Sequence, residues 1–247
     1  HPSRAYLARV LLARAAVAPG TRARGSRALG SFSGTSAAPR VSSAIRSSRG
    51  DATPSMSLID WFNDANRPLR SKEMAAAVNA SPALAAEVDR ATGNLPLHFT
   101  CCNGAPIVLV EALLAAHAAG ARARDGDGNL PIAGAISCGA PAAVVKLLLD
   151  AYPDGARSVD GKKLTLLHQA ACSGQSAETV RLLLAAWPEA AAMRDDKGNA
   201  PLHFAAGCKA APDVVKELLA ACPEAASWRG QLDRYPLSLC LLCEAPP

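Results

Sequence analysis

The chain has 247 residues, half of them hydrophobic, and 26 Lys and Arg against 21 Asp and Glu give a net charge of +5. Residues 1–50 hold nine Arg and no acid, which leaves the remainder with 17 basic and 21 acidic residues and a net charge of −4. Nucleic-acid binding needs clustered basic residues, and a membrane span needs about 18 consecutive apolar residues. Neither occurs, so the sequence predicts no nucleic-acid partner and no membrane span.

Residues 1–55 are rich in Arg, Ser, Ala and Gly. This composition is typical of an organellar transit peptide, and residues 27–31 (RALGS) resemble a mitochondrial processing site. The segment would then direct the protein to a mitochondrion or plastid.

Two other interpretations of this segment stay open. On a helix, Leu7 and Leu11 fall on the same side as Arg4 and Arg14, so the segment is not cleanly amphipathic. It is then a disordered low-complexity tail, or Met56, the first Met, is the true start. In both cases the protein would be cytoplasmic.

The sequence predicts that residues 56–92 form an N-terminal cap of the repeat array. Ser71 is placed to cap a helix from Lys72 to Val78, and SPALAAEVDR at 81–90 is similar to the later segments WPEAAAMRDD and CPEAASWRGQ. A terminal unit of a repeat protein must present polar residues outward.

Residues 93–247 repeat with a step of 35 residues, which predicts stacked supersecondary units. The units open with GNLPLHF at 93, GNLPIAG at 128, KLTLLHQ at 163, GNAPLHF at 198 and DRYPLSL at 233. Because Pro at a first helical turn loses no hydrogen bond, each opening predicts the start of a short helix.

A second apolar block follows about ten residues later in each unit, with i, i+3, i+4 spacing that predicts an amphipathic helix. Its members are Val110, Leu113, Leu114, Val145, Leu148, Leu149, Val180, Leu183, Leu184, Val215, Leu218 and Leu219, and the outward column is Glu111, Lys146, Arg181 and Lys216. Pro residues precede and follow these helices, and a polar return segment of about ten residues is expected to form turns. No unit can stand alone, so Leu113, Leu148, Leu183 and Leu218 are expected to align along one spine.

The motifs Pro-Leu-His at 96–98 and 201–203, Leu-Leu-His at 166–168 and the Val-x-x-Leu-Leu blocks resemble the ankyrin repeat family over roughly residues 70–247. Each unit is two residues longer than the usual one, and the Thr that shares hydrogen bonds with the motif His is present only as Thr165. The resemblance implies an all-α helical-hairpin solenoid of four full repeats and a partial last one. It also implies a concave surface of loop tips and inner helices that binds another protein.

Three His residues recur in one column, at His98, His168 and His203, and Ala133 occupies the same column in the second repeat without apparent loss. Zinc needs its ligands within about 2.1 Å, whereas stacked helices lie about 8 to 10 Å apart. The sequence therefore predicts His residues that brace turns, and no metal site.

The Cys residues also fall in columns: Cys102 and Cys172 share one, and Cys138, Cys208 and Cys243 share the next. We expect small buried packing residues there, since a free Cys behaves as a small hydrophobe. A lone Cys240-x-x-Cys243 indicates redox or zinc chemistry only weakly.

Catalytic motifs such as GxSxG or a phosphate-binding loop do not occur, so the sequence predicts no catalytic residue, no cofactor and no enzyme. The expected partner-binding residues lie in the return loops: Arg124, Asp125, Asp127, Asp160, Lys162, Met193, Arg194, Asp195, Asp196, Lys197, Trp228 and Arg229. Charged tips would select a partner. Trp228 would either anchor it or cover the last repeat.

The last unit carries an apolar run, Leu237, Leu239, Leu241 and Leu242, and lacks a second helix. An exposed stripe of this kind favours association or a truncated parent chain. The function that follows is a non-enzymatic protein-protein interaction scaffold. The alternative is a structural subunit docked in a larger organellar complex, with residues 1–55 as its import signal.

Overall fold

A computed structural model describes residues 57–63 and 70–239. The predictions for residues 1–55, Met56, Cys240, Leu241, Leu242 and Cys243 concern residues outside these ranges, as does the organellar alternative that depends on residues 1–55.

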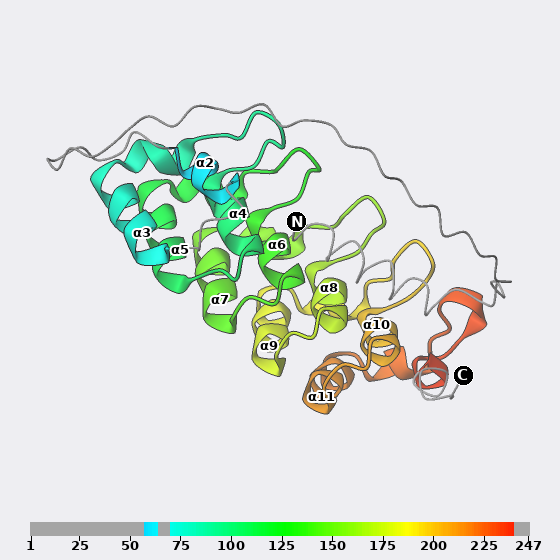
Figure 1. Ribbon diagram of the computed structural model, residues 1–247. Helices are drawn as coiled ribbons and strands as arrows, with labels where there is room; N and C mark the ends of the chain where they lie inside the picture. Colours follow the sequence, from blue (N-terminus) through cyan, green and yellow to red (C-terminus); the bar gives the residue numbers. More distant parts are fainter. Residues whose placement is uncertain (1–56, 64–69, 240–247) are drawn as a thin grey trace, which may run out of the picture.

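Four helical hairpins stack in register along the described chain (Figure 1). The inner helices are α4 (Pro96–Cys102), α6 (Pro131–Ser137), α8 (Leu166–Cys172) and α10 (Pro201–Gly207). The outer helices are α5 (Ile107–Ala116), α7 (Ala142–Ala151), α9 (Ala177–Ala186) and α11 (Pro212–Ala221). We call the units repeat 1 (93–127), repeat 2 (128–162), repeat 3 (163–197) and repeat 4 (198–232).

The inner helices begin where the sequence predicted. Pro96, Pro131 and Pro201 are each the first residue of their helix, and Leu166 takes that position in α8. Pro at this position has no N–H to leave unpaired and already has a helical φ. The turn three residues earlier needs a left-handed backbone: Gly93, Gly128 and Gly198 have φ of 70°, 82° and 80°, and Lys163 has 59°.

The aliphatic spine predicted for the outer helices is confirmed. Leu113, Leu148, Leu183 and Leu218 are at most 2% exposed and belong to one continuous core. Each such side chain contributes about 1.5 to 3 kcal/mol when fully buried. The outward column of Glu111, Lys146, Arg181 and Lys216 is exposed, so each outer helix buries one face against its neighbours.

The return segments differ from the all-polar turns that were predicted. Their first half forms a 3-10 turn after each outer helix: η2 (Ala118–Arg122), η3 (Pro153–Arg157), η4 (Pro188–Ala192) and η5 (Pro223–Ser227). In η4, Ala190 and Ala191 are buried in the core. In η3, η4 and η5 a proline fixes the turn's first φ, and in all four turns the small residues pack toward the core, so only the second half of each segment is a polar loop.

The N-terminal part adds α2 (Leu58–Asn63), α3 (Ser71–Ala80) and η1 (Pro82–Ala86). The helix predicted after residue 71 is confirmed, and η1 matches the later 3-10 turns. The cap assignment was wrong, because Ser71 is the first helical residue and Arg70 takes the N-cap position without a side-chain hydrogen bond.

The exposed stripe expected in the last unit is only partly present. Leu237 is 71% exposed, but Leu239 is 4% exposed and buried. Residues 236–239 are helical, and two positions apart on a helix point to different sides, so these two leucines do not share a face.

Candidate partner-binding surface

An aspartate builds the tip of the polar loop in repeats 1, 2 and 3. Asp125 Oδ1 accepts from the N–H groups of Asp127 and Asn129 at 3.0 and 2.7 Å. Asp160 in the loop of repeat 2 and Asp195 in the loop of repeat 3 accept the same two bonds, at 2.7 to 2.9 Å. These three carboxylates are therefore committed to turn structure, a use that the short Asp side chain suits well.

Neighbouring tips are also joined to one another at two places. Gly126 N donates to Thr92 O at 2.9 Å, and Asp196 N donates to Lys162 O at 3.2 Å. Lys163 and Asp196 add an exposed ion pair at 3.9 Å, a type of contact worth little on its own. The described residues show no equivalent backbone bond from the loop of repeat 1 to the loop of repeat 2.

The His residues brace the start of three of the four inner helices, α4, α8 and α10, as predicted. The Nδ1 atoms of His98, His168 and His203 accept from the backbone N–H three residues earlier, each at 3.1 Å. Nε2 of His168 lies 3.1 Å from Asn199 O, and Nε2 of His203 lies 3.1 Å from Trp228 O. Since Nδ1 accepts in His168 and His203, Nε2 of these two rings carries the proton and donates to the next loop.

Thr165 completes this brace in repeat 3. Its Oγ1 lies 2.9 Å from His168 Nδ1 and accepts from His168 N at 3.4 Å. Burial lowers the pKa of His168 to about 4, and burial likewise lowers the pKa values of His98 and His203. The rings are therefore neutral at pH 7 and act as structural groups.

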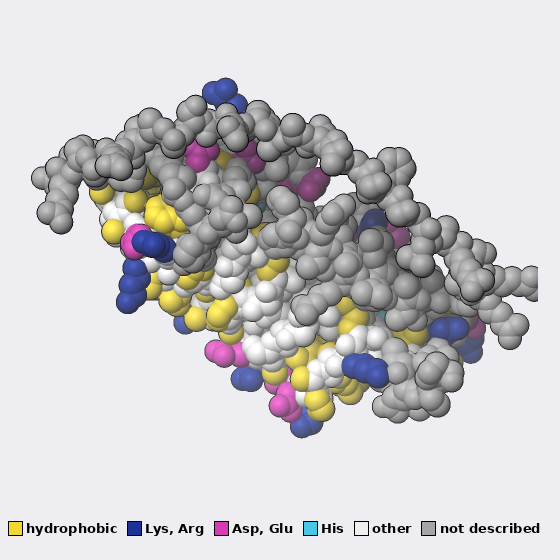
Figure 2. Space-filling view, viewed as in Figure 1, with side chains coloured by type: hydrophobic (Ala, Val, Ile, Leu, Met, Phe, Trp, Pro, Cys, Tyr) yellow, Lys and Arg dark blue, Asp and Glu magenta, His cyan; other side chains and the backbone are white. Residues whose placement is uncertain are grey.

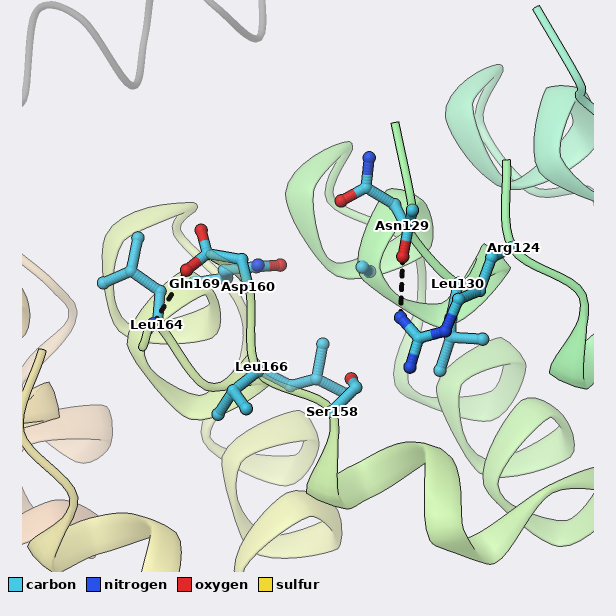
Figure 3. A pocket seen from close by; sticks show the side chains of 11 residues that line it. Arg124, Asn129, Leu130, Ser158, Asp160, Leu164, Leu166 and Gln169 are labelled. Atoms are coloured by element: carbon cyan, nitrogen blue, oxygen red, sulfur yellow. Dashed lines mark hydrogen bonds between the residues drawn. The ribbon is translucent and has the colours of Figure 1, made fainter. Parts of the chain in front are cut away.

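Repeat 2 lacks this brace, and a small hollow opens at the boundary with repeat 3 (Figure 3). Ala133 stands in the His column and lines the hollow together with Leu130, Asp160 and Gln169. No described side chain accepts from the Leu130 N–H, the group that His binds in the other repeats. The expectation that Ala133 replaces His without loss is therefore wrong, because one set of hydrogen bonds is gone.

The rim of the hollow is polar and its lower wall is apolar. Arg124 Nη1 donates to Gly128 O at 2.6 Å across the mouth, while Leu164 and Leu166 form part of the wall. A guanidinium has five donors, so Arg124 has capacity beyond this bond. Sequence reasoning missed the hollow, although the signal was visible as Ala in a column that otherwise holds His.

A buried glutamine holds repeats 2 and 3 together in place of that brace. Gln175 is 5% exposed, and its Nε2 donates to Ile136 O at 2.7 Å while its Oε1 accepts from Thr179 Oγ1 at 3.2 Å. The same column holds alanine in the other repeats, at Ala105, Ala140 and Ala210. Both ends of this buried amide are thus hydrogen-bonded, as burial requires.

The apolar residues proposed for partner contact lie at the far end of the loop row. Trp228 packs against the core and is half-buried, and the guanidinium of Arg194 lies 4.4 Å above its ring. Arg229 donates to Tyr235 Oη at 3.0 Å and also pairs with Asp233. Met193 is half-buried. Trp228 therefore covers repeat 4 and still presents part of its surface.

The remaining predicted contact residues, Arg124, Asp127, Lys162, Asp196 and Lys197, are exposed. On the face shown in Figure 2, basic and acidic side chains lie beside one another along the edge that the outer helices form, and they do not merge into one basic patch. Charges of both signs that are fixed on a rigid surface favour selectivity between partners.

The cysteines differ from the small buried residues that were predicted. Cys101 and Cys222 are buried, but Cys102, Cys138, Cys172 and Cys208 are only half-buried. Cys102 shares a hydrogen bond with Cys138, and Cys172 shares one with Cys208. The members of two neighbouring columns therefore meet across adjacent repeats, a contact that the 36-residue spacing of each pair could have predicted.

Residues 57–63 and 70–239 hold no group of three or more His, Cys, Asp or Glu placed to bind a metal ion. Within the same residues no helix is both long and apolar enough to cross a bilayer.

The repeat pattern also matches a known family. Residues 140–227 match the family model for ankyrin repeats, in three copies. A search of curated proteins found no match to this chain. The family match and the stacked helical hairpins together give an all-α, ankyrin-like fold, and ankyrin repeats generally mediate protein-protein interaction.

Proposed function

We propose that this chain, whose residues 140–227 are ankyrin repeats, is a non-enzymatic scaffold that binds a protein partner through its loop tips and inner helices. The observation that carries this proposal is the hollow between repeats 2 and 3, where Ala133 stands in the His column and the half-buried Leu164 lies on the wall.

The chemistry of the hollow indicates what kind of group would enter it. The Leu130 N–H and the Arg124 guanidinium are donors, and the half-buried Leu164 provides apolar surface. A donor pair of this kind suits a carbonyl or carboxylate oxygen. We therefore expect an extended partner segment that runs over the loop tips and places an oxygen acceptor beside Arg124 at the mouth of the hollow.

The charged tips would guide the approach and register of that segment. Arg124, Asp127, Lys162 and Lys197 are exposed on consecutive loops, and rim charges act mainly on association rate and selectivity. Trp228 and Met193 would add apolar area at one end of the row, since Trp is enriched among residues that dominate binding energy.

Selection of random peptides displayed on phage against the full chain tests this proposal. Affinity of the selected peptides is then measured for wild type, Arg124→Ala and the matched control Lys146→Ala, whose side chain is exposed on the opposite side of the unit in an outer helix. We expect Arg124→Ala to weaken binding about ten-fold, the order of a charge-assisted hydrogen bond, and Lys146→Ala to leave it unchanged.

Two outcomes contradict the proposal. One is a selection that yields no peptide binding more tightly than about 1 mM, which is a free energy of only about −4 kcal/mol. The other is equal weakening by both substitutions, because that result would place the peptide on the outer helices instead of the loop tips.

A further inference from the structure

Four half-buried cysteines form two equivalent pairs on the inner helices. Cys102 is the last residue of α4 and Cys172 the last of α8, while Cys138 and Cys208 are the C-cap residues that directly follow α6 and α10. The two cysteines of each pair are 36 residues apart in the sequence, which is one repeat plus one residue. The same arrangement therefore occurs twice, once between repeats 1 and 2 and once between repeats 3 and 4.

The two cysteines of each pair lie at the ends of adjacent helices that pack against each other. Helix α4 packs against α6, and α8 packs against α10. A side-chain hydrogen bond links Cys102 to Cys138, and another links Cys172 to Cys208. The Cys102 sulfur lies so close to the α6 backbone that a Cβ added to Gly134 would come within 2.9 Å of it.

The fold does not need thiols at these positions. At the boundary between repeats 2 and 3 the equivalent residues are Ser137 and Ser173, and that boundary is formed nonetheless. Ser137 Oγ instead bonds to Gln169 Oε1 at 3.4 Å. A packing role alone does not explain why two boundaries carry thiol pairs and one carries a serine pair.

One thiol of the first pair is activated by the other. Cys102 S–H donates to the Cys138 sulfur, which lowers the pKa of Cys138 to about 7 and raises that of Cys102. The hydrogen bond from Cys208 likewise lowers the pKa of Cys172. Burial instead raises the pKa of the neighbouring Cys101. Thiolate character and access determine which cysteine reacts, and both favour Cys138 over Cys101.

We propose that Cys102–Cys138 and Cys172–Cys208 are redox-active dithiol pairs that are oxidised to inter-repeat disulfides by a low-molecular-weight disulfide. In each pair the thiol with the lower pKa ionises, and its thiolate attacks one sulfur of the oxidant. This step forms a mixed disulfide and releases one thiolate of the low-molecular-weight compound. The partner thiol then loses its proton and attacks the protein-side sulfur, which forms the inter-repeat disulfide and releases a second small thiolate. Two electrons pass from the two cysteines to the oxidant, so the exchange balances.

Oxidation would link the four repeats as two pairs and leave the boundary between repeats 2 and 3 without a disulfide. Repeats 1 and 2 would be cross-linked, and so would repeats 3 and 4, while Ser137 and Ser173 cannot form such a bond. The hollow at Ala133 lies at that middle boundary. The exchange needs only the thiols and an oxidant, so it does not depend on the proposed partner-binding function.

Peptide mapping of the full chain tests the pairing. The protein is equilibrated with mixtures of reduced and oxidised glutathione, alkylated, digested with trypsin and analysed without reduction. We expect residues 91–122 linked to 125–146 and residues 164–181 linked to 198–209, with a loss of about 2 Da per link. The Cys101→Ser variant should keep the first link, and Cys102→Ser should abolish it.

A rate measurement tests the activation separately. At pH 7 a thiol with a pKa of about 7 is half ionised, whereas one near 8.5 is only about 3% ionised. We therefore expect Cys102→Ala to slow alkylation of Cys138 by about ten-fold at pH 7 and much less at pH 9.5. Circular dichroism of the variant shows whether the fold is retained.

Several results would overturn the proposal. One is mixed glutathione adducts that accumulate without inter-repeat links, and another is a link that uses Cys101 in place of Cys102. Links between non-adjacent pairs, such as Cys138 with Cys172, would show scrambling in an unfolded chain. An alkylation rate for Cys138 that does not change in Cys102→Ala would remove the activation step.

Discussion

The boundary between repeats 3 and 4 and the boundary between repeats 2 and 3 have the same backbone but different side-chain contacts. At the first, His168 joins Thr165 to Asn199, and Cys172 contacts Cys208. At the second, Ala133 replaces the His, serines replace the thiols, and a hollow lies between the loops. Comparing the two boundaries therefore separates the contacts that the stacking of repeats requires from the side-chain contacts that vary between repeats.

What both boundaries share is the aliphatic spine. Leu148, Leu183 and Leu218 are buried to the same extent on either side, so the stacking energy is similar. The polar braces are added to that core and differ between repeats. A binding site can thus form where a brace is missing, since Gln175 keeps the neighbouring helices joined by its bond to Ile136.

Removing the brace should have the largest effect. His168→Ala deletes a fully buried ring together with its bonds to Thr165 and Asn199. We expect the free energy of unfolding to fall by about 3 kcal/mol, from the cavity and from the lost hydrogen bonds. Urea unfolding measures this, with Ala133→Ser as the control that should change stability by less than about 0.5 kcal/mol. A loss below about 1 kcal/mol for His168→Ala would mean that the boundary is not braced.

Acid should weaken the braced boundary selectively. The folded pKa of His168 is about 4, below the ordinary value, so the unfolded chain binds more protons between about pH 6.5 and pH 4. The contribution of neutral His168 to the free energy of unfolding is complete above pH 6.5. It is lost as the pH falls toward 4, and the loss is at most about 3 kcal/mol. His98 and His203 act in the same direction.

Urea unfolding at pH 7, 5.5 and 4.5 checks this dependence. In His168→Asn the amide oxygen keeps an acceptor near Thr165 N–H but has no group that titrates in this range, so the slope with pH should be shallower. Equal slopes in the variant and in wild type would contradict the assignment to His168.

Adding a brace to the open boundary should have a smaller, opposite effect. In Ala133→His the new ring can accept from Leu130 N–H and fill the hollow. One net intramolecular hydrogen bond contributes about 1 kcal/mol, so the unfolding free energy should rise by that amount. Destabilisation by more than about 1 kcal/mol would show that the hollow is too small for the ring.

A change of similar size is expected at the glutamine that substitutes for the brace. Gln175→Ala restores the residue found in the other repeats and removes the bond to Ile136. We expect a loss of about 1 kcal/mol, since Ile136 O also accepts from Gly139 N at 3.3 Å. The matched change Lys146→Ala, on an exposed position, should cost less than about 0.5 kcal/mol. Equal values for the two variants would mean that Gln175 does not join the repeats.

The sequence predicted the repeat geometry well because its signals are local. Pro96 and Pro201 mark helix starts, and the i, i+3, i+4 leucines mark the buried face, so both could be assigned without knowing what lies next to them. The buried 3-10 turns were missed because alanines such as Ala190 carry no polarity signal of their own.

The site was harder to predict, since it depends on pairs of residues in different repeats. Reading each column separately showed Ala133 as a tolerated change and Cys102 as packing. Only the stacking of one repeat on the next shows that Ala133 leaves a hollow beside Asp160, and that Cys102 meets Cys138 at a spacing of one repeat plus one residue.

The most direct test of the account is the affinity of a peptide selected on wild type for the Ala133→His variant. If the open boundary is the binding site, the added ring occupies the hollow and should weaken binding at least ten-fold while the unfolding free energy stays the same or rises. Unchanged affinity in a correctly folded Ala133→His protein would contradict it.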